Sequence, residues 1–141
     1  MRSIGVSLKD RWSEGPKTYL GLTVVGFPNM FTITGPGSPS VLTNMLPSIE
    51  QHVDWIADCL ISLRERGVRV IEPLDEAQEQ WVGHVGEAAG TTLRSSCSSW
   101  YVGANIPGKP RVFMPYIGGF PAYIERWQAV VAGDYEGFAK A

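Results

Sequence analysis

The stretch from Thr34 to Leu46, TGPGSPSVLTNML, decides how this chain is expected to fold. A short apolar run, residues 30–34, comes directly before it, and glycine and proline then break the run. Pro47 suits the first turn of a helix, where its missing N–H costs little. Apolar residues then recur at spacings of four and three, the pattern of a helix with one apolar stripe: Ile49, Val53, Ile56, Leu60 and Leu63. The sequence therefore predicts a strand over 30–34, a glycine-rich turn and a helix over 47–66.

The rest of the chain predicts alternating short elements and loops. Asp75 and Gln78 have the spacing of a capping box, which predicts a helix start there. The expected elements are an extended segment over 68–71, a helix from Asp75 that buries Ala77, Trp81, Val85 and Ala88, loops over 91–99 and 100–110, a strand over 111–116, and a last helix with Tyr123, Trp127, Val130 and Val131. Tyr135 and Phe138 are expected to pack back onto the core.

Composition limits the classes of function. The 141 residues are 44% hydrophobic and 18% charged, which is typical of one globular domain. The net charge of −2, with basic residues scattered, gives no footprint for nucleic acid. No apolar run approaches the ~20 residues that span a bilayer, so no membrane contact is expected. Two cysteines, Cys59 and Cys97, and two histidines are too few for a metal cluster and favour a reduced, cytoplasmic setting.

The glycine-rich turn suits an electron-rich ligand, although a rigid structural turn explains the same spacing. A strand that leads through glycines into a helix offers backbone N–H groups and the positive end of the helix dipole. The pattern is not a phosphate-binding fingerprint, because Ser40 replaces the third glycine and Pro36 and Pro39 remove donors. The residue types alone leave both interpretations open.

A second informative stretch is residues 99–110, SWYVGANIPGKP. A tryptophan on a loop rich in glycine and proline is either a plug in the core or a residue of a mobile lid. Phe113 and Met114 follow the loop and are either ordinary core residues or the wall of an apolar pocket.

Four segments together resemble the carboxy-terminal part of Baeyer–Villiger monooxygenases, flavin enzymes that use NADPH and O₂. They are FPN at 27–29, GPGSPS at 35–40, NMLPSIEQHVDW at 44–55 and the loop at 99–110. The resemblance implies an α/β fold, the C-terminal fragment of a Rossmann-like flavoprotein with two dinucleotide-binding domains, built of helices, a few strands and long loops. Residues 1–66 would end the FAD-binding domain, and residues 67–141 would form a C-terminal extension with an NADP-closing loop.

The same resemblance assigns roles to individual residues. Asn44 and Met45 would contact FAD. Trp100 would donate its indole N–H to NADP, with Asn105 and Lys109 on the same loop and Lys109 facing the phosphates. The substrate pocket would be bordered by Ser40, Val41, Leu42, Phe113 and Met114. The longer form of the turn is similar to that of phenylacetone-type members and favours larger or aromatic ketones.

The resemblance also says what this sequence lacks. The glycine fingerprints for FAD and NADP and the family's catalytic arginine belong upstream, so no catalytic residue is assigned here and the chain alone is expected to be inactive. Its partners would be a small-molecule ketone, O₂ and the missing FAD and NADP domains. Alone, it is expected to expose an apolar helix face and to associate. Three alternatives stay open: a flavin monooxygenase that oxidises amines or sulfides, a non-catalytic remnant or binding module, and an interaction domain whose aromatics form the core.

Overall fold

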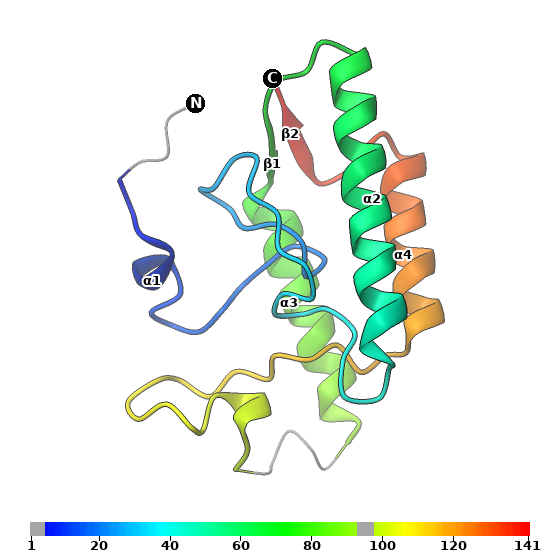
Figure 1. Cartoon of the computed structure of the whole chain (residues 1–141). Coiled ribbons are helices and arrows are strands. Elements are labelled where there is room, and N and C mark those ends of the chain that lie inside the picture. Colours follow the sequence, from blue (N-terminus) through cyan, green and yellow to red (C-terminus); the bar gives the residue numbers. More distant parts are fainter. Residues whose placement is uncertain (1–4, 93–97) are drawn as a thin grey trace.

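The computed structural model describes residues 5–92 and 98–141. Four α-helices and two short strands alternate with long loops (Figure 1). In chain order they are α1 (Leu8–Arg11), α2 (Met45–Glu65), β1 (Ile71–Pro73), α3 (Asp75–Gly90), a 3₁₀ helix (Trp100–Val102), α4 (Phe120–Ala132) and β2 (Phe138–Lys140). Residues 93–97, which include Cys97 and part of the predicted loop 91–99, lie outside the described residues.

α2 and α4 lie side by side, and the loops that follow α1 pass between these helices and α3 (Figure 1). β1 pairs antiparallel with β2, with Ile71 opposite Lys140 and Pro73 opposite Phe138. This pair ties the end of the chain to the start of α3. Within the described residues it is the only sheet. No helix of this part of the chain is long and apolar enough to cross a membrane.

The predicted helix over 47–66 is confirmed as α2, but the face that it buries is a different one. The Asn44 side chain caps the start by accepting the N–H of Leu46 at 3.1 Å. The buried residues are Ser48, His52, Trp55, Cys59 and Leu63. Within the predicted stripe only Leu63 is buried, whereas Val53 is 46% and Leu60 49% exposed. The stripe is therefore largely open, in agreement with the expectation that the chain alone exposes an apolar helix face.

α3 and α4 confirm the two later helices, with a different start for α3. The cap of α3 is Leu74, which makes no side-chain hydrogen bond, so the predicted capping box is wrong. Gln78 is buried instead, and its Oε1 accepts the N–H of Val25 at 3.0 Å. Asp75 accepts a hydrogen bond from Arg11 at 3.1 Å. Tertiary partners thus take both side chains away from the helix end.

The predicted strands over 30–34 and 111–116 are wrong. Thr32 donates its N–H to Leu22 O at 2.7 Å, and Tyr116 donates its N–H to Ser38 O at 2.9 Å. Thr34 has φ +54°, and Tyr116 makes only an isolated bridge with Pro39, so neither segment belongs to a ladder of strand pairs. In these two segments, residues with a high β propensity therefore hydrogen-bond to loops instead of forming a sheet.

Aromatic side chains fill the core between the three long helices. Trp55, Trp81 and Tyr123 are each at most 2% exposed. Tyr116, Trp81 and Tyr123 pack against one another, with ring centroids 5.3, 6.0 and 6.1 Å apart. Tyr135 and Phe138 are buried as predicted and contact Trp55. The loops described next pack on these aromatic side chains; Trp81, for example, donates its indole N–H to Gly37 O.

Candidate functional site

Two stretches far apart in the sequence are hydrogen-bonded into one unit, which we call the loop cluster: residues 35–46, and the continuous run of 99–110 and 111–116. Gly37 donates its N–H to Met114 O at 2.6 Å, and Met114 donates its own to Tyr101 O at 2.8 Å. Tyr116 and Ser38 add the bond described above. The glycine-rich turn, the tryptophan loop and the segment with Phe113 and Met114 therefore hold fixed positions relative to one another.

Glycines allow the turn to sit directly on the core. Gly37 has φ +82°, and a Cβ there would lie 2.9 Å from Trp81 Nε1. The Trp81 indole donates to Gly37 O at 3.2 Å. A Cβ at Gly21 would lie 2.8 Å from the backbone nitrogen of Ser38. Any larger residue at either position would push the turn off its support.

Val41 is the most strained residue of the turn. Its φ is +70°, a conformation that β-branched residues strongly disfavour. Leu42 donates its N–H to Ser40 O at 2.7 Å, which closes a γ-turn around Val41. Leu42 is 59% exposed as a result. Backbone strain of this kind is often found at ligand sites. The strained residue, Val41, is the middle one of the three residues predicted to border the substrate pocket.

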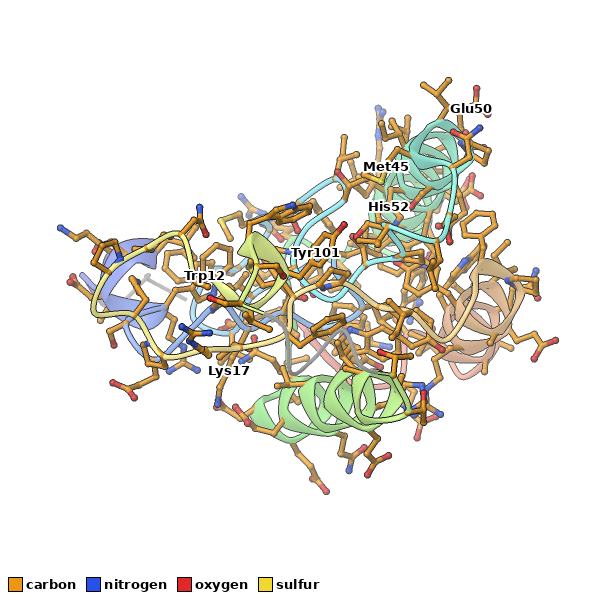
Figure 2. All side chains as sticks on the ribbon, turned by 90° about the horizontal axis from the view of Figure 1, so that it is seen from below. Trp12, Lys17, Met45, Glu50, His52 and Tyr101 are labelled. Carbon is orange, nitrogen blue, oxygen red and sulfur yellow. The ribbon has the colours of Figure 1, made fainter. Side chains whose placement is uncertain are left out.

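Asn44 and Met45 lie where the turn enters α2. Asn44 is the cap, and Met45 is the first helical residue and is part-exposed. Figure 2 shows Met45 on the loop side of α2 and Glu50 directed away from the interior. Leu46 donates its N–H to Asn44 and Pro47 has none, so this end offers an electron-rich group mainly the positive end of the helix dipole.

The tryptophan loop carries Trp100 outward. Trp100 is 56% exposed and stacks beside Tyr101, with ring centroids 4.3 Å apart, whereas Val102 is the buried residue of this turn. Trp100 is therefore not a core plug in this structure. Asn105 is exposed. Lys109 donates an ammonium N–H to Trp12 O at 3.0 Å and so links the tryptophan loop to the N-terminal segment.

Two adjoining pockets open along the loop cluster. The first has a volume of about 260 Å³ and is lined by residues that include Trp12, Pro36, Ile106, Lys109 and Met114. The second, of about 210 Å³, is lined partly by Phe113 and Met114. Met114 thus contributes to both pockets. Ser40, Val41 and Leu42 line neither of them. The predicted substrate residues therefore lie in two places: Phe113 and Met114 at the pockets, and the other three at the γ-turn.

A buried histidine that the sequence analysis did not assign holds the turn to two helices. Thr34 donates its N–H to His52 Nδ1 at 2.9 Å, so the proton is on Nε2. Nε2 lies 2.8 Å from Tyr123 Oη and donates to it, and Tyr123 donates to Leu20 O at 2.6 Å. Figure 2 shows His52 directed into the molecule. Since 71 residues separate His52 from Tyr123, no local spacing signals this pair.

The surroundings keep this relay neutral. Burial lowers the pKa of His52 to about 4, and burial also raises the pKa of Tyr123 well above its ordinary value. A protonated imidazole would turn Nδ1 into a donor facing the donor N–H of Thr34. The neutral form is therefore the one that fits this site, and its role is to position the start of the loop cluster.

Other chemistries find little support in the described part of the chain. No group of three His, Cys, Asp or Glu residues there is placed to hold a metal ion. Cys59 is buried, and burial raises the pKa of its thiol to about 11, which makes it a poor nucleophile.

Comparisons with known proteins identify the class. No protein-family model matches the chain. It is 44% identical over 136 residues to an acetone monooxygenase (methyl acetate-forming) of Gordonia sp. (strain TY-5), covering 96% of this chain and 26% of that protein. It is 46% identical over 131 residues to a Baeyer–Villiger monooxygenase of Pseudooceanicola batsensis, covering 93% and 24%. A phenazine N-monooxygenase of Lysobacter antibioticus is 38% identical over 134 residues, covering 95% and 24%.

The fold agrees with the sequence. The solved structure of an oxidized steroid monooxygenase bound to NADP matches with a TM-score of 0.89 and 47% identity, over 97% of this chain and 25% of that one. These relatives are monooxygenases, and the chain spans about a quarter of their length. The chain is similar to one portion of Baeyer–Villiger monooxygenases, consistent with the resemblance to their carboxy-terminal part that the sequence shows.

Proposed function

We propose that this chain forms part of an FAD- and NADPH-dependent monooxygenase that inserts one oxygen atom of O₂ into a ketone, giving an ester or a lactone. The observation that carries the proposal is the loop cluster. Residues 35–46 and 99–110 of the cluster contain most of the motifs that resemble the family, and backbone hydrogen bonds that pass through Met114 hold them as one unit. The substrate and the activity belong to the whole protein, of which relatives suggest that this chain is about a quarter.

In such an enzyme the bound FAD, reduced by NADPH, supplies the oxygen transfer. The residues of this chain would position and enclose the reaction. The N-terminal end of α2, with Asn44 and Met45, would face the electron-rich edge of the flavin. The γ-turn at Val41 would fix the shape of the adjoining substrate wall.

The apolar pocket at Met114 and the exposed Trp100 would complete the site. Walls of proline, isoleucine and methionine exclude water, which suits a reaction that water and stray protons would divert. The exposed indole N–H of Trp100 is available as a donor to NADP, and Asn105 lies on the same loop. For Lys109 to reach a phosphate, its bond to Trp12 O would have to open.

The size of the ketone is a separate question. We inferred larger or aromatic ketones from the long form of the turn. Relatives of nearly equal identity are named for acetone and for a steroid, so identity alone does not favour one size.

A full-length chimera tests the proposal. The portion of the Gordonia acetone monooxygenase that matches this chain is replaced by the chain itself, and NADPH consumption is compared with ester formation from a ketone. We expect ketone-dependent NADPH consumption that matches ester formation. A folded, FAD-loaded chimera that forms no ester would contradict the proposal.

The role of Trp100 is tested in the same chimera. We expect Trp100→Ala to weaken NADP retention and to uncouple oxygen consumption from product formation, because the loop loses the indole N–H that would bind NADP. Pro107→Ala is a matched control on the same loop, since Pro107 is exposed, has no polar side chain and lines neither pocket. Equal NADP affinity and coupling in Trp100→Ala and the control would remove Trp100 from the site.

A second candidate is oxygenation of nitrogen or sulfur. The 38% identity to a phenazine N-monooxygenase supports it. Product analysis of the chimera with a ketone, a thioether and an aromatic N-heterocycle separates the two reactions. A protein that oxidises only the heterocycle or the thioether would belong to the second class. A chain that never assembles with flavin would instead be a binding module or remnant.

A further inference from the structure

A further cavity lies away from the loop cluster, between α3, α4 and the start of β2. Its volume of about 390 Å³ exceeds that of either pocket beside the loop cluster. No residue of the loop cluster lines it. Its lining includes Tyr19, Ala77, Trp81, Arg126, Val130 and Glu136. A cavity of this size can hold a small organic molecule.

The floor of the cavity is apolar, and hydrogen bonds hold it in place. Trp81, Tyr19 and Val130 are 2%, 8% and 8% exposed. The Tyr19 hydroxyl donates to Glu136 O at 3.1 Å, and the Trp81 indole donates to Gly37 O at 3.2 Å. Because both rings are tied to backbone carbonyls, they do not turn into the cavity and close it. The cavity is therefore formed before any ligand arrives.

The rim of the cavity carries one arginine and two glutamates. Arg126 lies on α4, Glu76 on α3 and Glu136 just before β2. Within residues 5–92 and 98–141, Arg126 forms no salt bridge with either carboxylate. Burial raises the pKa of Tyr19, while Arg126 lowers it and Glu136 raises it. A positive and a negative group therefore both act on the floor of one cavity without pairing with each other.

Opposite charges that share a cavity without a salt bridge suit a ligand that carries both charges itself. The guanidinium of Arg126 can donate two parallel hydrogen bonds to a ligand carboxylate. The carboxylates of Glu136 and Glu76 can accept hydrogen bonds from a ligand ammonium. With one positive and two negative side chains on the rim, a second negative group on the ligand would be repelled.

We propose that this cavity binds a free α-amino acid with an apolar or aromatic side chain. Such a molecule combines both charges with an apolar body. Its carboxylate pairs with Arg126, its ammonium pairs with Glu136, and its side chain lies on Trp81 and Val130. The site is separate from the loop cluster, so it does not depend on the proposed function.

Isothermal titration of the folded Gordonia chimera tests the site with three probes of similar size. L-Phenylalanine carries both charges, phenylpropionate only the carboxylate, and phenylethylamine only the ammonium. We expect L-phenylalanine to bind about tenfold more tightly than either of the others, because each of these lacks one charged hydrogen bond. Equal binding of the three probes, or no binding of L-phenylalanine, would overturn the proposal.

Two charge variants separate the two ends of the ligand. Arg126→Gln should weaken binding of L-phenylalanine and phenylpropionate by about tenfold and leave phenylethylamine unchanged. Glu136→Gln should weaken only the two probes that carry an ammonium. Arg64→Gln is the matched control, because Arg64 is exposed on α2 and lines none of the cavities described.

A filling variant tests the cavity without changing its charge. Ala129 lines the cavity and is exposed, so Ala129→Phe should occupy the space without entering the core and should abolish binding of L-phenylalanine. Binding that neither the filling variant nor the charge variants change would place the ligand elsewhere and overturn the proposal. Binding that these variants abolish or weaken, in a chimera that forms no ester, would keep the amino-acid site and reject only the proposed function.

Discussion

The two long faces of α2 reverse the arrangement expected of a surface helix. The buried face contains the polar Ser48 and His52 beside Trp55, while the face with Leu46, Val53 and Leu60 stays open. The buried face is specific, because His52 has a partner on each ring nitrogen. The open face is apolar without directional contacts. The difference teaches that α2 packs on this chain through its polar and aromatic face and leaves an apolar face open.

The largest expected difference between the faces comes from truncating Trp55. The side chain is 2% exposed and packs on Tyr135 and Phe138, so Trp55→Ala removes core volume. We expect the free energy of unfolding to fall by about 3–5 kcal/mol. Urea denaturation followed by circular dichroism measures it. A loss below about 1 kcal/mol would mean that this face is not packed as described.

The second expected effect is a pH dependence that belongs to the buried face. The pKa of His52 is lowered from 6.5 to about 4, so the unfolded chain binds more protons between these values. Stability should therefore be complete above pH 6.5 and decrease towards pH 4, by about 3 kcal/mol for a fully buried group. Urea denaturation at half-unit pH steps measures this change.

His52→Gln should flatten the slope in that window. Asp134 does not disturb it, because Arg66 and Lys140 hold the pKa of its carboxyl at about 2. An unchanged slope in His52→Gln would assign the pH dependence to another group.

A smaller effect is expected from Tyr123→Phe. The substitution keeps the ring but removes the hydroxyl that accepts from His52 and donates to Leu20 O. We expect a loss of about 1–3 kcal/mol, since a buried N–H and a buried carbonyl both lose their partner. The His52 ring nitrogen shifts, read by two-dimensional NMR, should report a changed environment at Nε2. Unchanged stability and unchanged shifts would place the hydroxyl outside the relay.

The smallest effect is expected on the open face. Leu60→Ala should change the stability of the dilute chain by less than about 0.5 kcal/mol, because half of the side chain is already in water. In the full-length chimera the same substitution should cost more, since the partner portion would bury it. Equal small effects in both proteins would argue that nothing packs on this face.

The sequence predicted the long helices well, because their periodicity and end signals are local. Periodicity located the apolar stripe of α2 but did not indicate that a second face, with Ser48 and His52, packs on this chain. Val53 and Leu60 are about half exposed, as expected for an apolar helix face of the chain taken alone. The strands at 30–34 and 111–116 failed for a related reason: their N–H groups bond to loops, which no propensity indicates.

The site was predicted in part. The motifs located the glycine-rich turn and the tryptophan loop, and Met114 lies where both meet. The strain at Val41 requires the backbone angles, and the pairing of His52 with Tyr123 requires the tertiary structure. The assigned contacts of Asn44 and Trp100 with cofactors stay predictions.

The most direct test of the account is the composition of the native assembly in the source cells. Native purification with an antibody to this chain, followed by peptide mass spectrometry and an absorption spectrum, gives size, sequence and flavin content together. We predict a yellow assembly several times larger than 15.4 kDa that contains nucleotide-binding glycine fingerprints, in the same polypeptide or in a bound one. A colourless product of 15.4 kDa with no bound partner would contradict the account.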